Sequence, residues 1–241
     1  MTRTERCGQD RTAPIPLGMY VHVPFCARRC GYCAFATTAV GEALDPSVAA
    51  RYLDGVADEL RLAATVLGAD RAPLHCVYLG GGTPTTLSVA QVERLLADVH
   101  HRFEVDPDAE ISIEANPDGL VDGQLEGLRS AGVTRVSFGM QSIRRDVLDL
   151  LDRTHDPELA LDAVADARAA GFDHVSLDLI HGTPGERIAD WDATLHAAIA
   201  SGVDHVSAYA LSIEPGTKLA ARVRTGELPR PSDDEAADRY V

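Results

Sequence analysis

The sequence has no long apolar run and little positive charge. No stretch approaches the ~20 consecutive apolar residues of a membrane span, and residues 1–14 lack the apolar centre of a secretory signal. Lys and Arg total 22 against 37 Asp and Glu, which leaves a net charge of −15. We therefore expect a cytoplasmic chain without an integral membrane segment. We expect no nucleic-acid partner, because such partners usually require a basic face.

Cysteine is scarce as well, and its distribution argues against disulfides. Of five cysteines, Cys26, Cys30 and Cys33 fall within eight residues. An odd and clustered set in a reducing compartment indicates metal binding. Cys7 lies in the polar N-terminal segment, and Cys76 begins a strand that reads as buried. We expect neither of these two to be a ligand.

The rest of the chain alternates strand-like runs with amphipathic helices. The 241 residues, 45% of them hydrophobic, suit one large domain with a sizeable core. A Gly…Val-Ser template recurs at Gly132, Gly171 and Gly202, where each glycine can end a helix before the next strand. The predicted strands are Met19–Val23, Cys76–Gly80, Ile111–Ala115, Arg135–Met140, Val175–Ile180 and Val206–Leu211. This α/β pattern predicts a partial (β/α)6 barrel of the TIM type.

Three helices have recognisable features. Ser88 and Gln91 form a capping-box pattern before an apolar stripe that ends at Phe103. Asp156-Pro157 is typical of a helix start, with aspartate as the N-cap and proline at the first position. A third helix carries Trp191, Leu195, Ala198 and Ile199 on what we take to be one apolar face.

We expect three segments along the chain. Residues 1–16 form a flexible N-terminal tail, and residues 17–231 form the core barrel. Residues 232–241 begin a helix that Ser232 caps and that is too short to be stable alone, since isolated helices need about 12–15 residues. The chain is therefore expected to stop short of a further C-terminal domain.

The three clustered cysteines follow the first predicted strand directly. Three thiolates so close together can wrap a [4Fe–4S] cube and leave its fourth iron without a protein ligand, free to chelate S-adenosylmethionine (SAM). Three other interpretations are open. The cysteines could share a helix face in the core, although Pro24 and Gly31 disfavour a helix. They could bind zinc together with His22, or Cys30 and Cys33 could form a redox pair.

At these residues the chain resembles the radical SAM superfamily. The C-x3-C-x2-C spacing, with Tyr32 before the last cysteine, is the signature of that superfamily. The segment from Tyr20 to Cys26 is similar to the group that contains oxygen-independent coproporphyrinogen III oxidases and HemW-like haem chaperones. Further matching motifs are Gly80–Thr85, Ser112–Pro117 around Glu114, Phe138–Ser142, Arg153–His155, Asp178–Gly182 and Tyr209–Leu211.

One position separates the two branches of this group. The oxidases carry a further cysteine two residues after the motif, where this chain has Phe35, as HemW-like chaperones do. The stretch before Tyr20 is also shorter than in the oxidases. The resemblance thus implies a protein that holds a cluster and SAM, binds haem as cargo and passes it to acceptor proteins. It also implies an electron donor for the cluster. The alternative is radical decarboxylation of coproporphyrinogen III.

The polar residues of the matching motifs fall at the carboxyl ends of the predicted strands, where barrels build their sites. Arg153 can pair with a carboxylate of SAM or of a porphyrin, or alternatively with Asp149 or Asp152 at the surface. His22, His155 and His181 are candidate haem-iron ligands, each more often simply hydrogen-bonded. The resemblance, together with this placement, predicts as cofactor-binding residues Tyr20, Tyr32, Gly81, Gly82, Thr83, Glu114, Gln141, Arg153, Asp178 and Ala210, with Cys26, Cys30 and Cys33 as metal ligands.

Overall fold

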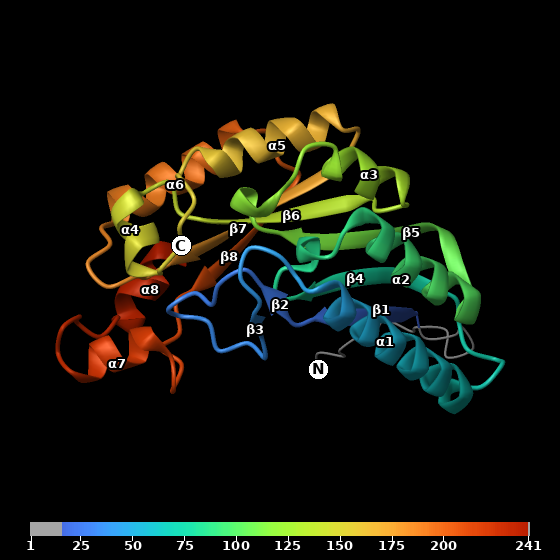
Figure 1. Cartoon of the computed structure of the whole chain (residues 1–241). Coiled ribbons are helices and arrows are strands. Elements are labelled where there is room, and N and C mark those ends of the chain that lie inside the picture. Colours follow the sequence, from blue (N-terminus) through green and yellow to red (C-terminus); the bar gives the residue numbers. More distant parts are fainter. Residues whose placement is uncertain (1–15, 241) are drawn as a thin grey trace, which may run out of the picture.

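The computed structural model describes residues 16–240, so Cys7 and almost all of the predicted N-terminal tail lie outside the described residues. Six parallel strands form one sheet in the order β1-β4-β5-β6-β7-β8. These strands are β1 (Leu17–Val23), β4 (Leu74–Gly81), β5 (Val105–Ala115), β6 (Arg135–Gln141), β7 (His174–His181) and β8 (His205–Ala210). A second, small sheet pairs β2 (Phe25–Cys26) with β3 (Thr38–Ala39). The large sheet curls into a half barrel (Figure 1).

Most of the helices form an arc outside the curled sheet, and the last two lie near the carboxyl ends of the strands (Figure 1). The helices are α1 (Pro46–Leu67), α2 (Val89–Arg102), α3 (Gln124–Ser130), α4 (Arg145–Leu150), α5 (Leu159–Ala169), α6 (Ile188–Ala200), α7 (Lys218–Arg224) and α8 (Asp233–Tyr240), with short 3-10 turns η1 (Pro84–Thr86) and η2 (Pro117–Gly119). This is the predicted partial (β/α)6 barrel. No helix in the described part of the chain is long and apolar enough to cross a membrane.

The two faces of the sheet have opposite chemistry, because side chains alternate along a strand. The face toward the helices is apolar: Val77, Ile113, Val136 and Leu177 are at most 1% exposed and belong to one core cluster. The concave face carries polar side chains and remains open. The core therefore lies between the sheet and the helices, which leaves the concave face available for a site.

Most local expectations from the sequence are confirmed. All six predicted strands form, within two residues at most ends, although β5 begins earlier, at Val105. The capping box of α2 is present, since Gln91 N donates to Ser88 Oγ and Ser88 N donates to Gln91 Oε1. Gly132, Gly171 and Gly202 adopt φ of +100°, +89° and +77°, the left-handed conformation that glycine tolerates at a helix end.

Three expectations were wrong. Helix α5 begins at Leu159 rather than at Pro157: residues 157 and 158 form a turn before it, Glu158 is its N-cap residue, and the exposed Asp156 carboxylate lies 3.6 Å from Arg145 and does not cap it. Cys76 is exposed, because it lies on the open concave side of β4. Ile199 is 70% exposed, so the apolar face of α6 does not include it.

The final helix docks on the barrel. The Ser232 hydroxyl accepts from Glu235 N, as expected for its cap. Trp191 Nε1 donates to the Arg239 carbonyl at 3.0 Å, and the almost fully buried Arg239 guanidinium lies 3.6 Å from the Glu186 carboxylate. These contacts supply the tertiary support that an isolated helix of this length lacks.

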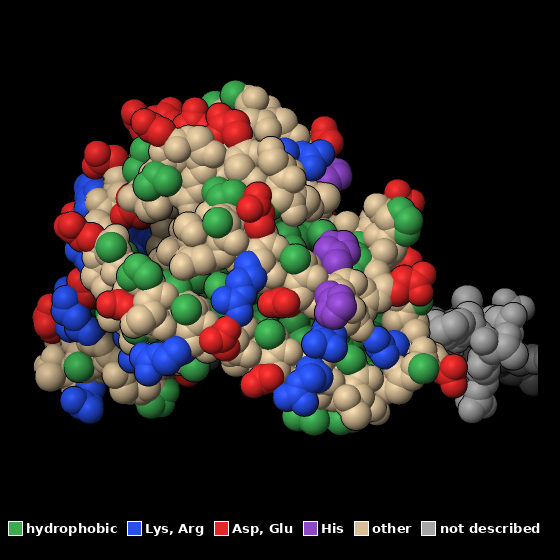
Figure 2. Space-filling model, turned by 45° about the vertical axis from the view of Figure 1, so that its right-hand side comes forward, with side chains coloured by type: hydrophobic (Ala, Val, Ile, Leu, Met, Phe, Trp, Pro, Cys, Tyr) green, Lys and Arg blue, Asp and Glu red, His purple; other side chains and the backbone are tan. Residues whose placement is uncertain are grey.

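Charges are mixed on the outer surface. On the face drawn in Figure 2, Lys and Arg side chains lie among Asp and Glu side chains over the lower half. This face offers no extended basic surface of the kind that a nucleic-acid backbone requires.

The packing of α2 predicts a stability difference between two leucines. Leu95 is completely buried and Leu62 of α1 is 61% exposed. Leu95→Ala should lower the free energy of unfolding by about 2–5 kcal/mol through lost burial and a residual cavity. Leu62→Ala should change it by less than about 0.5 kcal/mol. Urea unfolding of both variants measures the difference, and equal losses would contradict the assigned core.

Candidate functional site

The three clustered cysteines follow the carboxyl end of β1: Cys26 ends the short strand β2, and Cys30 and Cys33 lie in the loop between β2 and β3. The loop runs through bends and turns and contains no helix. Gly31 N donates to the Leu151 carbonyl at 3.2 Å, and Leu219 N donates to the Gly31 carbonyl at 2.9 Å. The turn after α4 and the start of α7 therefore hold the middle of the loop, between Cys30 and Cys33.

Gly31 lies close to the Asp152 side chain where the loop meets this turn. A Cβ on Gly31 would lie 2.3 Å from Asp152 Oδ2, so a side chain at position 31 requires the Asp152 carboxylate to move. Asp152 itself has φ of +56° and pairs with Lys218 at 2.9 Å. A side chain at position 31 would therefore disturb the pair between Asp152 and Lys218.

The glycine-rich turn after β4 supports the other side of the loop. Gly82 N donates to the Val23 carbonyl at 2.8 Å, and Thr83 N donates to the Phe25 carbonyl at 2.6 Å. A Cβ on Gly82 would lie 2.5 Å from the Phe25 oxygen. These bonds place the first cysteine, Cys26, against the turn that contains the predicted residues 81–83.

The environment of the three free thiols favours positively charged ligands. Burial raises the pKa of Cys26 and of Cys33, and the neighbouring thiols raise it further, because three thiolates repel one another. Iron supplies the positive charge that relieves this repulsion. The donor set therefore fits an iron–sulfur cluster.

Two polar groups donate to the sulfur atoms. Thr83 Oγ1 donates to Cys26 Sγ at 3.6 Å, and Arg153 Nη1 donates to Cys30 Sγ at 3.6 Å. Donors of this kind stabilise negative charge on sulfur and tune metal–thiolate centres. Both residues come from motifs that carry the family resemblance.

The competing interpretations of the cysteines fare differently. A shared helix face is wrong, since the loop has no helix. The zinc site with His22 is disfavoured, because His22 Nε2 lies 2.9 Å from the Ala36 carbonyl and Nδ1 lies 3.2 Å from the Tyr20 hydroxyl, so both ring nitrogens have partners. Between residues 16 and 240, no three His, Cys, Asp or Glu side chains converge on a single ion. A cube bound through separate corners does not need such convergence.

Glu114 organises the concave face beside the glycine-rich turn. It accepts from the Tyr78 hydroxyl at 2.8 Å and from Gly81 N at 2.9 Å. Gly81 has φ of +113°, which directs this N–H at the carboxylate. Burial raises the pKa of Glu114, and the two donors partly oppose that rise. Tyr20 stacks on Tyr78 with ring centroids 6.0 Å apart.

Gln141 ends β6, Asp178 lies near the carboxyl end of β7, and Ala210 ends β8. Asp178 accepts from Ser137 Oγ at 3.1 Å, and burial raises its pKa. Gln141 is buried with φ of +65°, unusual for a residue with a side chain. Ala210 pairs in register with His181 at the sheet edge. The structure thus brings these predicted residues to one rim.

Arg153 and Tyr32 lie beside the cysteine loop. Arg153 is buried, and its Nη2 donates to Asn116 Oδ1 at 2.9 Å and to the Gly139 carbonyl at 2.8 Å. The alternative of a surface ion pair is wrong, because Asp149 pairs with Arg145 and Asp152 pairs with Lys218. Tyr32 packs near Val147, Leu151 and Ile180, and burial raises its pKa.

Two of the three candidate haem-ligating histidines, His155 and His181, are buried. His155 is 2% exposed, and its Nε2 lies 3.2 Å from the Met140 carbonyl. Burial, followed by the Arg153 charge, lowers its pKa to about 4, so the ring is neutral at pH 7. His181 is equally buried and lies against Trp191, with ring centroids 5.1 Å apart.

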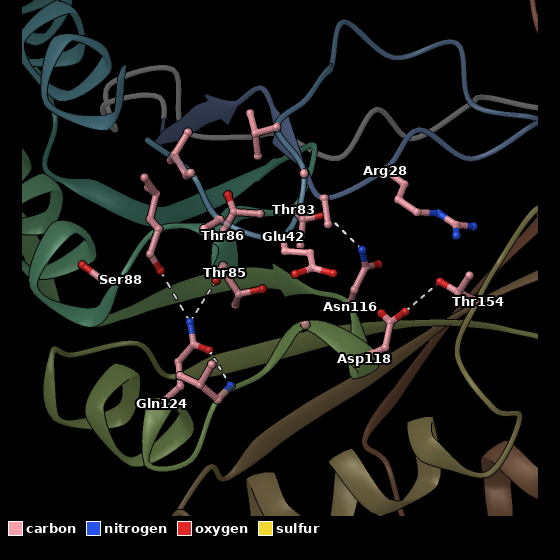
Figure 3. A pocket seen from close by; sticks show the side chains of 18 of the residues that line it. Arg28, Glu42, Thr83, Thr85, Thr86, Ser88, Asn116, Asp118, Gln124 and Thr154 are labelled. Carbon is pink, nitrogen blue, oxygen red and sulfur yellow. Dashed lines mark hydrogen bonds between the residues drawn. The ribbon is translucent and has the colours of Figure 1, made fainter. Parts of the chain in front are cut away.

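A cavity of about 550 Å³ borders the cysteine loop. Its walls come from residues 40–46 and from the turns after β4 and β5 (Figure 3). Cys30, Thr83 and Arg153 line it, whereas Tyr20, Glu114, Asp178 and Ala210 do not. This cavity and the polar concave face therefore meet at the cysteines from different sides.

Two residues of this region were missed from the sequence. Asn116 contacts both Thr83 and Arg153, and Tyr78 binds Glu114. Asn116 belongs to the same motif as Glu114, and its position before Pro117 at a strand end is a usable signal. Tyr78 lies two residues before Gly80, and period-2 alternation places both on one face.

Comparison with known proteins adds independent information. The radical SAM superfamily pattern matches residues 20–198. Heme chaperone HemW of Mycobacterium tuberculosis is 50% identical over 227 residues, which cover 93% of this chain and 57% of that protein. HemW of Synechocystis is 36% identical over 234 residues, which cover 94% of this chain and 54% of that protein. The solved structure of Escherichia coli HemN, a radical SAM coproporphyrinogen III oxidase, superposes with a TM-score of 0.80 at 31% identity and covers 94% and 51%. The chain thus spans about half the length of these relatives.

The raised pKa of Glu114 predicts a pH-dependent effect of Glu114→Gln. Above the ordinary carboxyl pKa of about 4.3 the unfolded chain loses a proton that folded Glu114 retains, so wild-type stability falls as pH rises toward the raised pKa. Glutamine has no such proton. The free energy of unfolding of Glu114→Gln, relative to wild type, should therefore increase as pH rises from about 4.3 toward the raised pKa and then level off.

Urea unfolding of the cluster-free chain at a series of pH values tests this expectation. Glu126→Gln, on the exposed side of α3, controls for removing one carboxylate from an acidic chain. Stability curves of wild type and Glu114→Gln that run parallel over the whole range would contradict the prediction.

Proposed function

Because the chain belongs to the radical SAM superfamily and is similar to HemW haem chaperones, we propose that it binds a [4Fe–4S] cluster, SAM and haem, and passes haem to acceptor proteins. The observation that carries the proposal is the braced loop of Cys26, Cys30 and Cys33 with donors to two of its sulfur atoms. An electron donor for the cluster is part of the same proposal, as is a cytoplasmic location, where thiols stay reduced.

We propose that the concave face holds SAM. The cluster, when bound, supplies one-electron chemistry toward the SAM sulfonium. Glu114 and the Gly81–Thr83 turn lie beside the first cysteine and offer a carboxylate and exposed backbone to an amino group. Asp178, Gln141 and Ala210 supply further polar and backbone groups on the same rim. Tyr20 supplies an aromatic surface, Tyr32 closes the apolar side, and Arg153 supplies a buried positive charge.

Haem binding is supported by exposed aromatic side chains around the same face. Tyr20 and Tyr209 are each 57% exposed, and Phe35 is 65% exposed. Flat aromatic surfaces suit a flat macrocycle, which offers a large apolar area for stacking. Phe35 occupies the position at which the oxidases carry a further cysteine, and this difference favours the chaperone over the oxidase.

Cluster loading depends on the three motif cysteines alone. After anaerobic reconstitution, the wild type should contain about four irons and four sulfides per chain, as expected for one cube. Cys30→Ala should lose most of both, because one corner of the cube loses its thiolate. Cys76→Ala, which removes an exposed cysteine outside the loop, should load like the wild type.

Iron and sulfide analysis and the electron paramagnetic resonance spectrum of the reduced protein measure this loading. The wild-type spectrum should change when SAM is added. Zinc in place of iron, or a Cys30→Ala variant that holds a full cluster, would overturn the assignment.

Haem uptake should depend on the exposed tyrosine of β8. Titration of the chain with haem, followed by absorbance, should show binding, and Tyr209→Ala should weaken it about tenfold, which corresponds to roughly 1.4 kcal/mol of lost stacking. Ile199→Ala removes a comparably exposed side chain on the outer surface of α6 and should leave haem affinity unchanged.

An activity assay of the reconstituted wild type distinguishes the chaperone from the oxidase. Under anaerobic reducing conditions with SAM, coproporphyrinogen III should keep all its propionates. Stoichiometric release of carbon dioxide from this substrate would contradict the chaperone proposal and support the oxidase. Absence of haem uptake would contradict the proposal that this part of the protein binds haem.

A further inference from the structure

Asn116 joins the two groups that donate to the cysteine sulfur atoms. It follows β5 directly and precedes η2, where its carbonyl accepts from Gly119 N at 3.2 Å. Its side chain lies between Thr83 and Arg153 on the cavity wall, and Figure 3 shows the bond between Asn116 and Thr83. The position thus connects one strand end to both sides of the cysteine loop.

The direction of each hydrogen bond follows from the chemistry of the partners. Arg153 can only donate, so the Asn116 oxygen Oδ1 must face its Nη2, 2.9 Å away. The amide nitrogen Nδ2 then faces Thr83 and donates to Oγ1 at 3.0 Å. The Thr83 hydroxyl accepts this bond, so its own proton is free for Cys26 Sγ.

The result is a continuous chain of directed bonds, which we name the Asn116 bridge. It runs from Cys26 Sγ through Thr83, Asn116 and Arg153 to Cys30 Sγ. Arg153 is additionally held by the Gly139 carbonyl at 2.8 Å, and Thr83 by its backbone bond to Phe25. A half-turn of the single Asn116 amide would place a donor against Arg153 and an acceptor against Thr83, so its orientation sets both sulfur contacts together.

We propose that Asn116 is a positioning residue that sets the reduction potential of the cluster by aiming Thr83 and Arg153 at two of its three thiolate ligands. This inference rests on the proposed cluster binding. Reduction adds negative charge to the cluster and its sulfur atoms, and hydrogen bonds to those atoms stabilise that charge. The intact bridge therefore raises the reduction potential, and its loss lowers it.

The test is a redox titration of the reconstituted wild type and of Asn116→Leu, which has a similar size and no hydrogen-bonding group. The midpoint potential, followed by electron paramagnetic resonance, should shift to a more negative value in Asn116→Leu while iron and sulfide contents stay at wild-type level. Gln124→Leu is the matched control. Gln124 is a buried amide in the same cavity that donates to the Thr85 carbonyl and contacts neither Thr83 nor Arg153 side chains.

Gln124→Leu should lower thermal stability and leave the midpoint potential unchanged, which separates a structural effect from an effect on the cluster. Coupling to Thr83 gives a second readout. Thr83→Val should lower the potential by removing the bond to Cys26, and the shift caused by Asn116→Leu should be smaller in the Thr83→Val background. Full additivity of the two shifts would contradict the bridge.

The outcomes separate the bridge from the function on which it rests. A wild type that loads no cluster overturns the proposed function and the bridge with it. A loaded wild type whose midpoint potential equals that of loaded Asn116→Leu overturns the bridge alone. If Asn116→Leu does not take up the cluster, Asn116→Ala, which only truncates the side chain, replaces it in the titration. Its midpoint potential is also expected to be more negative than that of the wild type.

Discussion

The close approach of the cysteine loop to two backbone turns is the constraint on which the rest of the site depends. On one side Gly82 and Thr83 bind the carbonyls of Val23 and Phe25, and on the other Gly31 lies against Leu151 and Asp152. A Cβ on Gly82 would meet the Phe25 carbonyl, and a Cβ on Gly31 would displace the Asp152 carboxylate. The parallel sheet makes both approaches possible, because it gathers the carboxyl ends of its strands at one rim.

The ionisable groups at this rim have the charges that a cluster and an amino-group ligand require. Three thiols and two carboxylates, all partly buried, lie at or near it with the buried Arg153 guanidinium, and burial raises the pKa of Cys26, Glu114 and Asp178. Such a combination is costly without ligands, since each group has lost part of its contact with water. A positively charged cofactor and a ligand with an amino group would reduce that cost, which is consistent with the family to which the chain belongs.

The resemblance to HemW and to HemN concerns the rim, and the difference between the two concerns a residue outside the cluster motif. The motifs that carry the resemblance to both lie at the rim, where we propose that the cluster and SAM bind. The side chain that differs, Phe35, lies beyond the cluster motif and is open to solvent. A change there alters what can approach the site and leaves the cysteine loop itself intact.

Local pattern in the sequence determined the strands, the capping box at Ser88, the left-handed glycines after α3, α5 and α6, and the cluster motif, because each depends on residues close together in the chain. It failed in two places: the turn after Asp156 does not join α5, and the open concave side exposes Cys76. The partners of Arg153 and the bridging position of Asn116 were decided by the tertiary structure alone. Cys30, Asn116, Gly139 and Arg153 come from four separate segments, and only the curling of the sheet brings them within hydrogen-bond distance.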